Sequence, residues 1–291
     1  MKAFFIRIFI TVMLCSAMPA CFAQHQEREV FLYNVFFGAV SSGIGAIINK
    51  PKVVNWRHAF LRGAWQGSIG GLVNYSSKKT LYLLNKNQDV FYASPALLLH
   101  AAGSSIIENA ALYQPFLRNW NIDYGPVRID WSPHRKLKVR FLPEIMYAGI
   151  RAGLYGRLNV KESLLTGIGV FETKNYTSGR GQTGYSFCRS VLITDNPFLE
   201  PNKDGVLSHE LVHVFQYRDY QVLNAWLKPL EKTVRSKTIN RIFSRYIYAD
   251  IPYFVPFYFS QGYYPFNRYF KNFYEFEAER FSTNKLVPYR H

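Results

Sequence analysis

Three long runs without a charged side chain constrain the fold of this chain more than any other feature. Each run is rich in glycine, alanine and serine, and together they cover residues 30–49, 63–77 and 90–107. Small residues recur four positions apart within them, as in Gly38/Ser42 and Gly63/Gly67, and this spacing lets two helix backbones approach closely. We therefore expect a glycine-rich helical lobe over residues 24–120.

Two environments are compatible with these helices. They are either closely packed helices of a soluble protein or membrane-associated helices of marginal hydrophobicity. Polar residues dilute all three runs, among them Asn34, Gln66, Asn74 and His100. The sequence therefore favours a lobe that at most associates with a membrane over one that firmly spans it.

A polar stripe follows His100, Ser104 and Glu108 at successive spacings of four. On a helix these side chains share one face, which can face a catalytic site or bind an ion. A hydrogen-bonded buried network is the simpler interpretation, and we favour it.

The first residues, MKAFFIRIFITVMLCSAMPACFAQ, have the layout of a secretory signal peptide. Lys2 and Arg7 accompany an apolar run, and small residues precede a polar segment. We expect cleavage after Ala23; a lipid-bearing Cys21 and an uncleaved membrane anchor are the alternatives. The chain is therefore expected in the periplasm or cell envelope, and only Cys188 would remain, so no internal disulfide can form.

The net charge of +16, or +14 without Lys2 and Arg7, limits the partners. A basic exported chain that is 17% aromatic suits an anionic membrane surface, although a merely soluble basic surface has the same composition. Nucleic acid is not an expected partner, because no recognition motif is present and the signal directs the chain out of the cytoplasm.

From Gly125 the pattern changes to apolar and polar residues in alternation, which is typical of half-buried strands. Ile129 and Trp131 flank Asp130, and Val139 and Phe141 flank Arg140. We therefore predict an antiparallel β region with an edge strand over residues 121–200 and a helical catalytic region over residues 201–291. With the signal peptide at 1–23 and the helical lobe, the predicted fold class is α+β.

The segment VLSHELVHVFQYR, residues 206–218, contains the motif HExxH. With this composition, chance would produce on the order of 0.01 such strings. His209 and His213 lie one helical turn apart and can bind one zinc ion, while Glu210 can activate a water molecule. A catalytic zinc site needs a third protein ligand.

Candidates for the third ligand are Glu275, Glu277 and Glu279. Glu275 and Glu279 share a helix face with Lys271, which is typical of a solvated charged stripe. Glu277 shares its face with aromatic residues, where a carboxylate needs compensation by a metal, an arginine or a hydroxyl. On this argument we predict Glu277 as the third ligand.

The segments HELVHVFQYRDY and GYYPFNRYFKNFYEFEAERFS resemble the gluzincin-like HExxH-plus-Glu zinc metallopeptidases, specifically small bacterial members with HELxHVxQ and a later ExEA segment. The resemblance covers about residues 190–285. It implies His209, His213 and Glu277 as Zn²⁺ ligands, Glu210 as general base, and residues 190–194 as the strand that pairs with an extended substrate. Phe281 departs from the family pattern, which places an acidic residue four positions beyond the ligand glutamate.

The implied function is an exported zinc metallopeptidase with a peptide or protein substrate. The oxyanion donor stays open among Tyr220, Tyr263 and Tyr264. The tail also resembles the regulatory peptidases related to phage-repressor-cleaving proteins, but those are cytoplasmic. Two other functions stay open: a non-catalytic envelope protein with a structural or vestigial zinc site, and a zinc hydrolase of a lipid-like substrate, which the aromatic residues 253–264 suggest.

Overall fold

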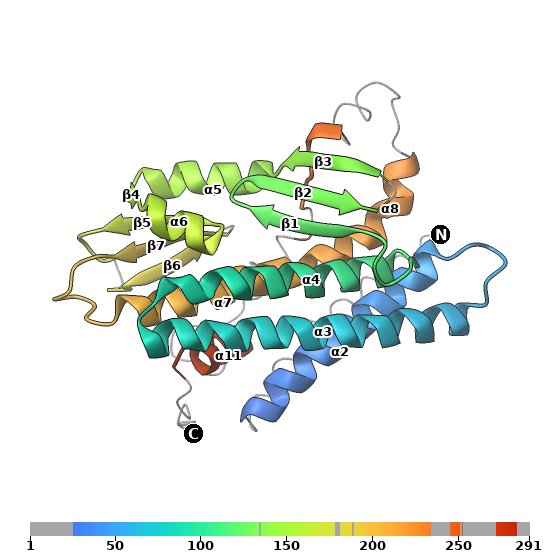
Figure 1. Ribbon diagram of the computed structural model, residues 1–291, viewed down its shortest axis with the longest axis horizontal. Coiled ribbons are helices and arrows are strands. Elements are labelled where there is room, and N and C mark those ends of the chain that lie inside the picture. The colour runs from blue at the N-terminus through green and yellow to red at the C-terminus, as the bar shows by residue number, and fades with distance from the viewer. Residues whose placement is uncertain are drawn as a thin grey trace.

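Helices and two small sheets make the α+β fold that the sequence predicts, as seen in a computed structural model (Figure 1). The structure describes residues 26–133, 135–177, 181–187, 189–233, 245–250, 252 and 272–283. The predicted signal peptide, Cys188 and the aromatic residues 253–264 lie outside the described residues.

The uncharged runs form helices, and these helices pack as closely as their small residues allow. They are α2 (Gln26–Asn49), α3 (Trp56–Asn87) and, after the short helix η1 (Val90–Tyr92), α4 (Ala93–Ala111). A Cβ atom on Gly67 would lie 2.2 Å from the carbonyl oxygen of Gly38, and one on Gly71 would lie 2.3 Å from that of Asn34. The predicted close approach of helix backbones is therefore confirmed between α2 and α3.

The strands form two sheets. Sheet A is antiparallel and contains β1 (Trp120–Tyr124), β2 (Val127–Ser132) and β3 (Arg135–Phe141), as the alternation predicts. Sheet B contains β4 (Arg157–Leu158), β5 (Gly169–Thr173), β6 (Gly184–Phe187) and β7 (Ser190–Thr194) in the order β4-β5-β7-β6. The expectation of a purely antiparallel region is corrected here, because β5 and β7 are parallel.

The predicted edge strand, residues 190–194, is an internal strand. β7 pairs with β5 on one side and with β6 on the other, and all its residues are buried. Its continuous apolar sequence fits a strand covered on both faces better than an edge strand. The edge strand of sheet B next to the HExxH helix is instead β6.

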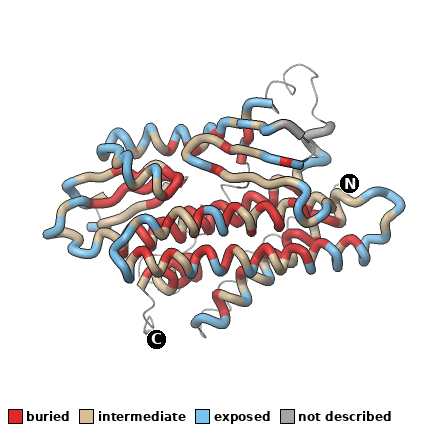
Figure 2. Tube along the Cα trace, in the orientation of Figure 1, coloured by how far each residue is buried: buried red, intermediate tan, exposed pale blue. Residues whose placement is uncertain are grey.

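The remaining helices are α5 (Pro143–Gly153), α6 (Val160–Thr166), α7 (Lys203–Asp219), η2 (Tyr220–Leu223), α8 (Asn224–Thr233) and α11 (Phe273–Thr283). One apolar cluster joins the helical, β and catalytic regions, with members from α2, α3, sheet B, α7 and α11: Val30, Leu81, Val170, Val191, Leu207 and Phe273. Figure 2 shows the buried residues running along α3 and α4 and into sheet B. The three predicted regions therefore share a core.

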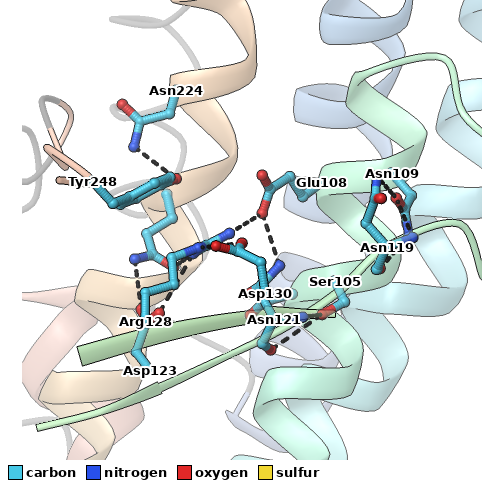
Figure 3. A network of polar contacts seen from close by, with 12 residues as sticks. Ser105, Glu108, Asn109, Asn119, Asn121, Asp123, Arg128, Asp130, Asn224 and Tyr248 are labelled. Atoms are coloured by element: carbon cyan, nitrogen blue, oxygen red, sulfur yellow. Dashed lines mark hydrogen bonds and ion pairs between the residues drawn. The ribbon is translucent and has the colours of Figure 1, made fainter. Parts of the chain in front are cut away.

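Sheet A is fixed to α4 by a buried arginine (Figure 3). The guanidinium of Arg128 on β2 pairs with Glu108 of α4 and with Asp130, and it lies 4.1 Å from the ring centre of Tyr248. Asn121 of β1 also donates to Glu108, at 2.9 Å. These contacts compensate the charge of a fully buried side chain.

Two described helical stretches, Glu27–Asn49 and Val90–Ala111, are long and apolar enough to cross a membrane by length and composition alone. Buried residues make up 39% and 50% of their most apolar windows. Core helices of soluble proteins and signal sequences meet the same criterion, so this is weak evidence for a membrane span.

The contact between Gly67 and Gly38 predicts a strong effect of one added methyl group. Gly67→Ala should lower the free energy of unfolding by about 2–3 kcal/mol, because the backbone of α2 cannot yield as a side chain would. Urea unfolding followed by circular dichroism measures this. Ser76→Ala, on the exposed face of the same helix, is the control and should change the free energy by less than about 0.5 kcal/mol. Equal effects would contradict close packing.

Candidate metal centre

The HExxH segment lies in helix α7, with its apolar residues on one face of the helix and its histidines on another. Leu207, Leu211 and Val214 of α7 are buried in the core. At the beginning of the helix the side chain of Asn202 accepts a hydrogen bond from the amide of Gly205. This arrangement leaves the histidines on a separate, partly exposed face.

The two histidines converge on Glu275 of α11. His209 Nε2 lies 3.1 Å from His213 Nε2, and each nitrogen lies 3.2 Å from Glu275 Oε2. The three atoms form a nearly equilateral triangle, and of the described residues these three form the cluster able to hold a metal ion.

The triangle fits a zinc ion. Tetrahedral zinc with bonds of about 2.0–2.1 Å holds its ligand atoms about 3.3 Å apart, close to all three observed separations. Two imidazoles and one carboxylate are also a usual donor set for catalytic zinc. The residues present therefore suit zinc in both chemistry and spacing.

Each histidine has a partner on its other ring nitrogen. Gln216 Oε1 lies 2.8 Å from His213 Nδ1, and because the amide nitrogen of Gln216 donates elsewhere, Oε1 accepts from Nδ1–H. Glu279 Oε2 lies 3.5 Å from His209 Nδ1. Such partners fix the ring orientation and leave Nε2 available to a metal.

Glu277, the predicted third ligand, lies elsewhere. Its carboxylate is fully buried and accepts hydrogen bonds from Lys78 at 3.0 Å, from Asn34 at 2.6 Å and from Gln216 at 2.8 Å. The structure therefore places Glu275, and not Glu277, beside the two histidines. The apolar face of α11 does need a compensated carboxylate, but a lysine supplies the compensation.

The polar face of α11, interpreted from sequence as solvated, lines the site. Glu275 and Glu279 are four residues apart, so both reach the histidines.

Charge reinforces the geometry. Burial opposes protonation of His209, but hydrogen bonds to Glu275 and Glu279 raise its pKa to about 10. Burial would raise the pKa of Glu275, but the two imidazoles hold it well below its usual range. The carboxylates of Glu275 and Glu279 thus make the surroundings of the His209 imidazole electrically negative, which favours a cation there.

Glu210 points from α7 towards the edge strand β6. A Cβ atom on Gly184 would lie 2.8 Å from Glu210 Oε1, and the side chain of Ser186 hydrogen-bonds to the carboxylate. Burial raises the pKa of Glu210, and the neighbouring histidines oppose that shift. A carboxylate with a raised pKa is better able to take up and release a proton near neutral pH.

The histidines and Glu210 open into a cleft of about 520 Å³. Its described lining comes from residues 181–186 on and before β6, from α7 and from α11. This volume lies within the usual range for binding sites of small ligands. Tyr185, Tyr217 and Tyr274 line the cleft. Tyr220 does not line it: this residue is buried, and its hydroxyl hydrogen-bonds to that of Tyr274. Tyr263 and Tyr264 lie outside the described residues.

A buried lysine, Lys78, holds the helices that carry the site together. Lys78 of α3 has no exposed surface and donates to Asp219 at 2.6 Å as well as to Glu277. Burial would lower its pKa, but Asp219 and Glu277 more than offset this and raise it. Sequence reasoning missed Lys78, because nothing local marks one lysine as buried.

The stripe of His100, Ser104 and Glu108 is the buried network that the sequence favours. His100 Nε2 donates to Asp219 at 3.1 Å, and Ser104 contacts His100 Nδ1 at 3.3 Å. Glu108 pairs with Arg128. The stripe therefore faces sheet A and the end of α7 and does not supply metal ligands.

Comparison with protein-family models, with curated proteins and with solved structures finds no match for the chain. Any assignment of class or activity therefore depends on the geometry of the site.

Removal of the Lys78 ammonium should destabilise the fold strongly. Lys78→Met leaves Asp219 and Glu277 buried without their shared cation, and we expect a loss of about 3–5 kcal/mol in the free energy of unfolding. The neighbouring Lys79 pairs with Glu27 on the surface, so Lys79→Met should cost less than about 1 kcal/mol. Chemical denaturation measures both, and similar losses would contradict the central role of Lys78.

Stability should also depend on pH through His100. Burial, opposed by Asp219, lowers the pKa of this histidine from 6.5 to about 4. As the pH falls, His100 therefore takes up a proton in the unfolded chain at a higher pH than in the folded protein. The neutral His100 contributes fully to the free energy of unfolding above pH 6.5, and this contribution is lost as the pH falls towards 4. It amounts to about 3 kcal/mol.

His100→Gln should lose correspondingly less stability between pH 7 and pH 4 than the wild type, as measured by urea unfolding at a series of pH values. Ser76→Ala provides the control, since it removes an exposed hydroxyl that does not titrate in this range and should leave the pH profile unchanged. A parallel profile for His100→Gln would contradict the lowered pKa.

Proposed function

We propose that this protein is an exported zinc-dependent hydrolase of the metallopeptidase class. The observation that carries the proposal is the triangle of His209, His213 and Glu275 beside the buried carboxylate of Glu210. The gluzincin resemblance supports it, now with Glu275 and Glu279 in the positions of ligand and supporting acid. Export is supported by the signal-like sequence of the first residues.

A bound zinc ion would polarise the scissile carbonyl and acidify the attacking water. His209, His213 and Glu275 would hold it, and Gln216 and Glu279 would keep the imidazoles oriented. Glu210 would accept the proton of the attacking water and return it to the leaving amine. Ser186 and Gly184 keep Glu210 against β6, which fixes the carboxylate for this role.

The edge strand β6 favours a peptide as substrate. Among the described strands β6 pairs only with β7, and residues 184–186 line the cleft next to Glu210. An extended peptide can add to such an edge through main-chain hydrogen bonds. A structural zinc site has no need of a carboxylate base or an open cleft, so these features favour an enzyme over a non-catalytic protein.

Substitution of the two glutamates on α11 tests the ligand assignment. Glu275→Gln should weaken zinc binding by more than about 100-fold, whereas Glu277→Gln, which acts through Gln216, should weaken it by no more than about 10- to 100-fold. Competition with a chelator of known affinity measures both. A larger effect at position 277 would restore that residue as the ligand, and absence of stoichiometric zinc from the wild type would refute the metal site.

Glu210→Gln tests the chemistry separately. This variant should bind zinc within a few-fold of the wild type and lose about 10²- to 10⁴-fold in hydrolysis of a mixed peptide library, measured by mass spectrometry. Retention of wild-type hydrolysis would contradict the role of Glu210 as the base. Asp204→Asn, on the first turn of the same helix, is the control and should keep both properties.

A further inference from the structure

The connection between α2 and α3, together with the first turns of α3, forms one end of the molecule. These residues, 50–65, are here called the hairpin tip, and Figure 1 shows them beyond the ends of the other elements on that side. Figure 2 shows that most of the hairpin tip is exposed. Val53 is 94% exposed and Trp65 is 72% exposed. The hairpin tip lies at the far end of α3 from sheet B and the metal centre.

An apolar stripe runs from the hairpin tip along the outer face of α3. Leu61, Trp65 and Leu72 are exposed and lie at helical spacings of four and seven, so they share one face. The opposite face carries Gly63 and Gly67, which pack on α2. Because α3 packs on α2 through that inner face, the fold does not need the outer apolar stripe for its core. An exposed apolar stripe of this kind is typical of an interaction surface.

The charge around the stripe has a single sign. No aspartate or glutamate occurs between Glu29 and Asp89, whereas Lys52, Arg57 and Arg62 are exposed in the hairpin tip. Arg57 lies 5.4 Å from the ring centre of Trp56. Tryptophans and basic side chains around an exposed apolar stripe are the composition of a surface that lies at a membrane–water interface.

We propose that the hairpin tip and the outer face of α3 bind the surface of a bilayer that contains anionic phospholipid. The basic side chains would contact headgroup phosphates, and Leu61, Trp65 and Leu72 on the outer face of α3 would enter the interfacial layer. The association is peripheral, since the inner faces of α2 and α3 belong to the protein core. Nucleic acid fits less well, because phosphate contacts leave the apolar stripe exposed. The inference is independent of the proposed metal centre.

Vesicle binding of the full chain tests the charge component. Wild type should co-sediment with phosphatidylcholine vesicles that contain phosphatidylglycerol, and only weakly with pure phosphatidylcholine or at high salt. Lys52→Gln combined with Arg57→Gln should weaken binding by about 30-fold, since each basic residue near such a surface contributes about fivefold. Any contribution of the apolar N-terminal residues is common to all variants.

The matched control removes two exposed basic residues from the opposite end of the molecule. Arg157→Gln combined with Lys161→Gln, on β4 and α6, should bind within about threefold of the wild type. Equal losses in the two double variants would overturn the proposal, because binding would then follow net charge and not the hairpin tip. Equal binding to both vesicle types would overturn it as well.

Quenching by brominated phosphatidylglycerol locates the contact. Trp56→Phe combined with Trp65→Phe should retain most of the vesicle binding but lose the quenching of tryptophan fluorescence. Trp131→Phe, which removes an exposed tryptophan from sheet A, should retain the quenching. Unchanged quenching in the Trp56/Trp65 double variant would show that another surface meets the lipid and would overturn the proposal.

Discussion

The ammonium group of Lys78 is the interaction on which the arrangement of this molecule depends. It lies without solvent between Asp219 at the end of α7 and Glu277 of α11, so three helices from distant parts of the chain meet at one charge. Neither carboxylate could be buried there alone at acceptable cost. From Glu277 the contacts continue through Gln216 to the imidazole of His213. The glycine-rich helices are therefore part of the candidate site and not a separate lobe beside it.

The glycines and this buried charge serve the same arrangement. Asn34 of α2 donates to Glu277 and accepts from Lys78, which requires α2 and α3 to approach closely enough for both side chains to reach α11. Gly71 makes that approach possible, because any side chain there would meet the backbone of Asn34. The uncharged sequence rich in small residues resembles a membrane segment, but the close packing of α2 and α3 around Lys78 and Glu277 explains it. The residues on the outer faces of these helices determine what the surface can bind.

Local patterns were sufficient to predict some elements and misleading for others. Alternation identified β2 and β3, and the spacing of His209 and His213 identified the face of α7 that carries the candidate site, because both depend only on neighbours in sequence. The choice among the glutamates of α11 failed, since the sequence assigned the apolar face to the metal. In the structure the polar face of α11 lines the cleft. The compensation of Glu277 comes from Lys78, whose position no local pattern reveals. The strand order of sheet B was missed for a similar reason: β7 is internal because it pairs with β5 in parallel as well as with β6.

The shared core has a consequence for how such a site can be inherited or engineered. Lys78 and Glu277 are separated by 199 positions, and Asn34 lies earlier still. A segment that starts at the HExxH motif would include the residues of the candidate metal centre. It would lack the ammonium group of Lys78 and the side-chain amide of Asn34, which stabilise Glu277. Residues 203–283 grafted onto another scaffold would therefore contain the HExxH motif but would lack Lys78 and Asn34, which hold Glu277 in place. A transfer that keeps the site would have to move α2, α3, α7 and α11 together as one block.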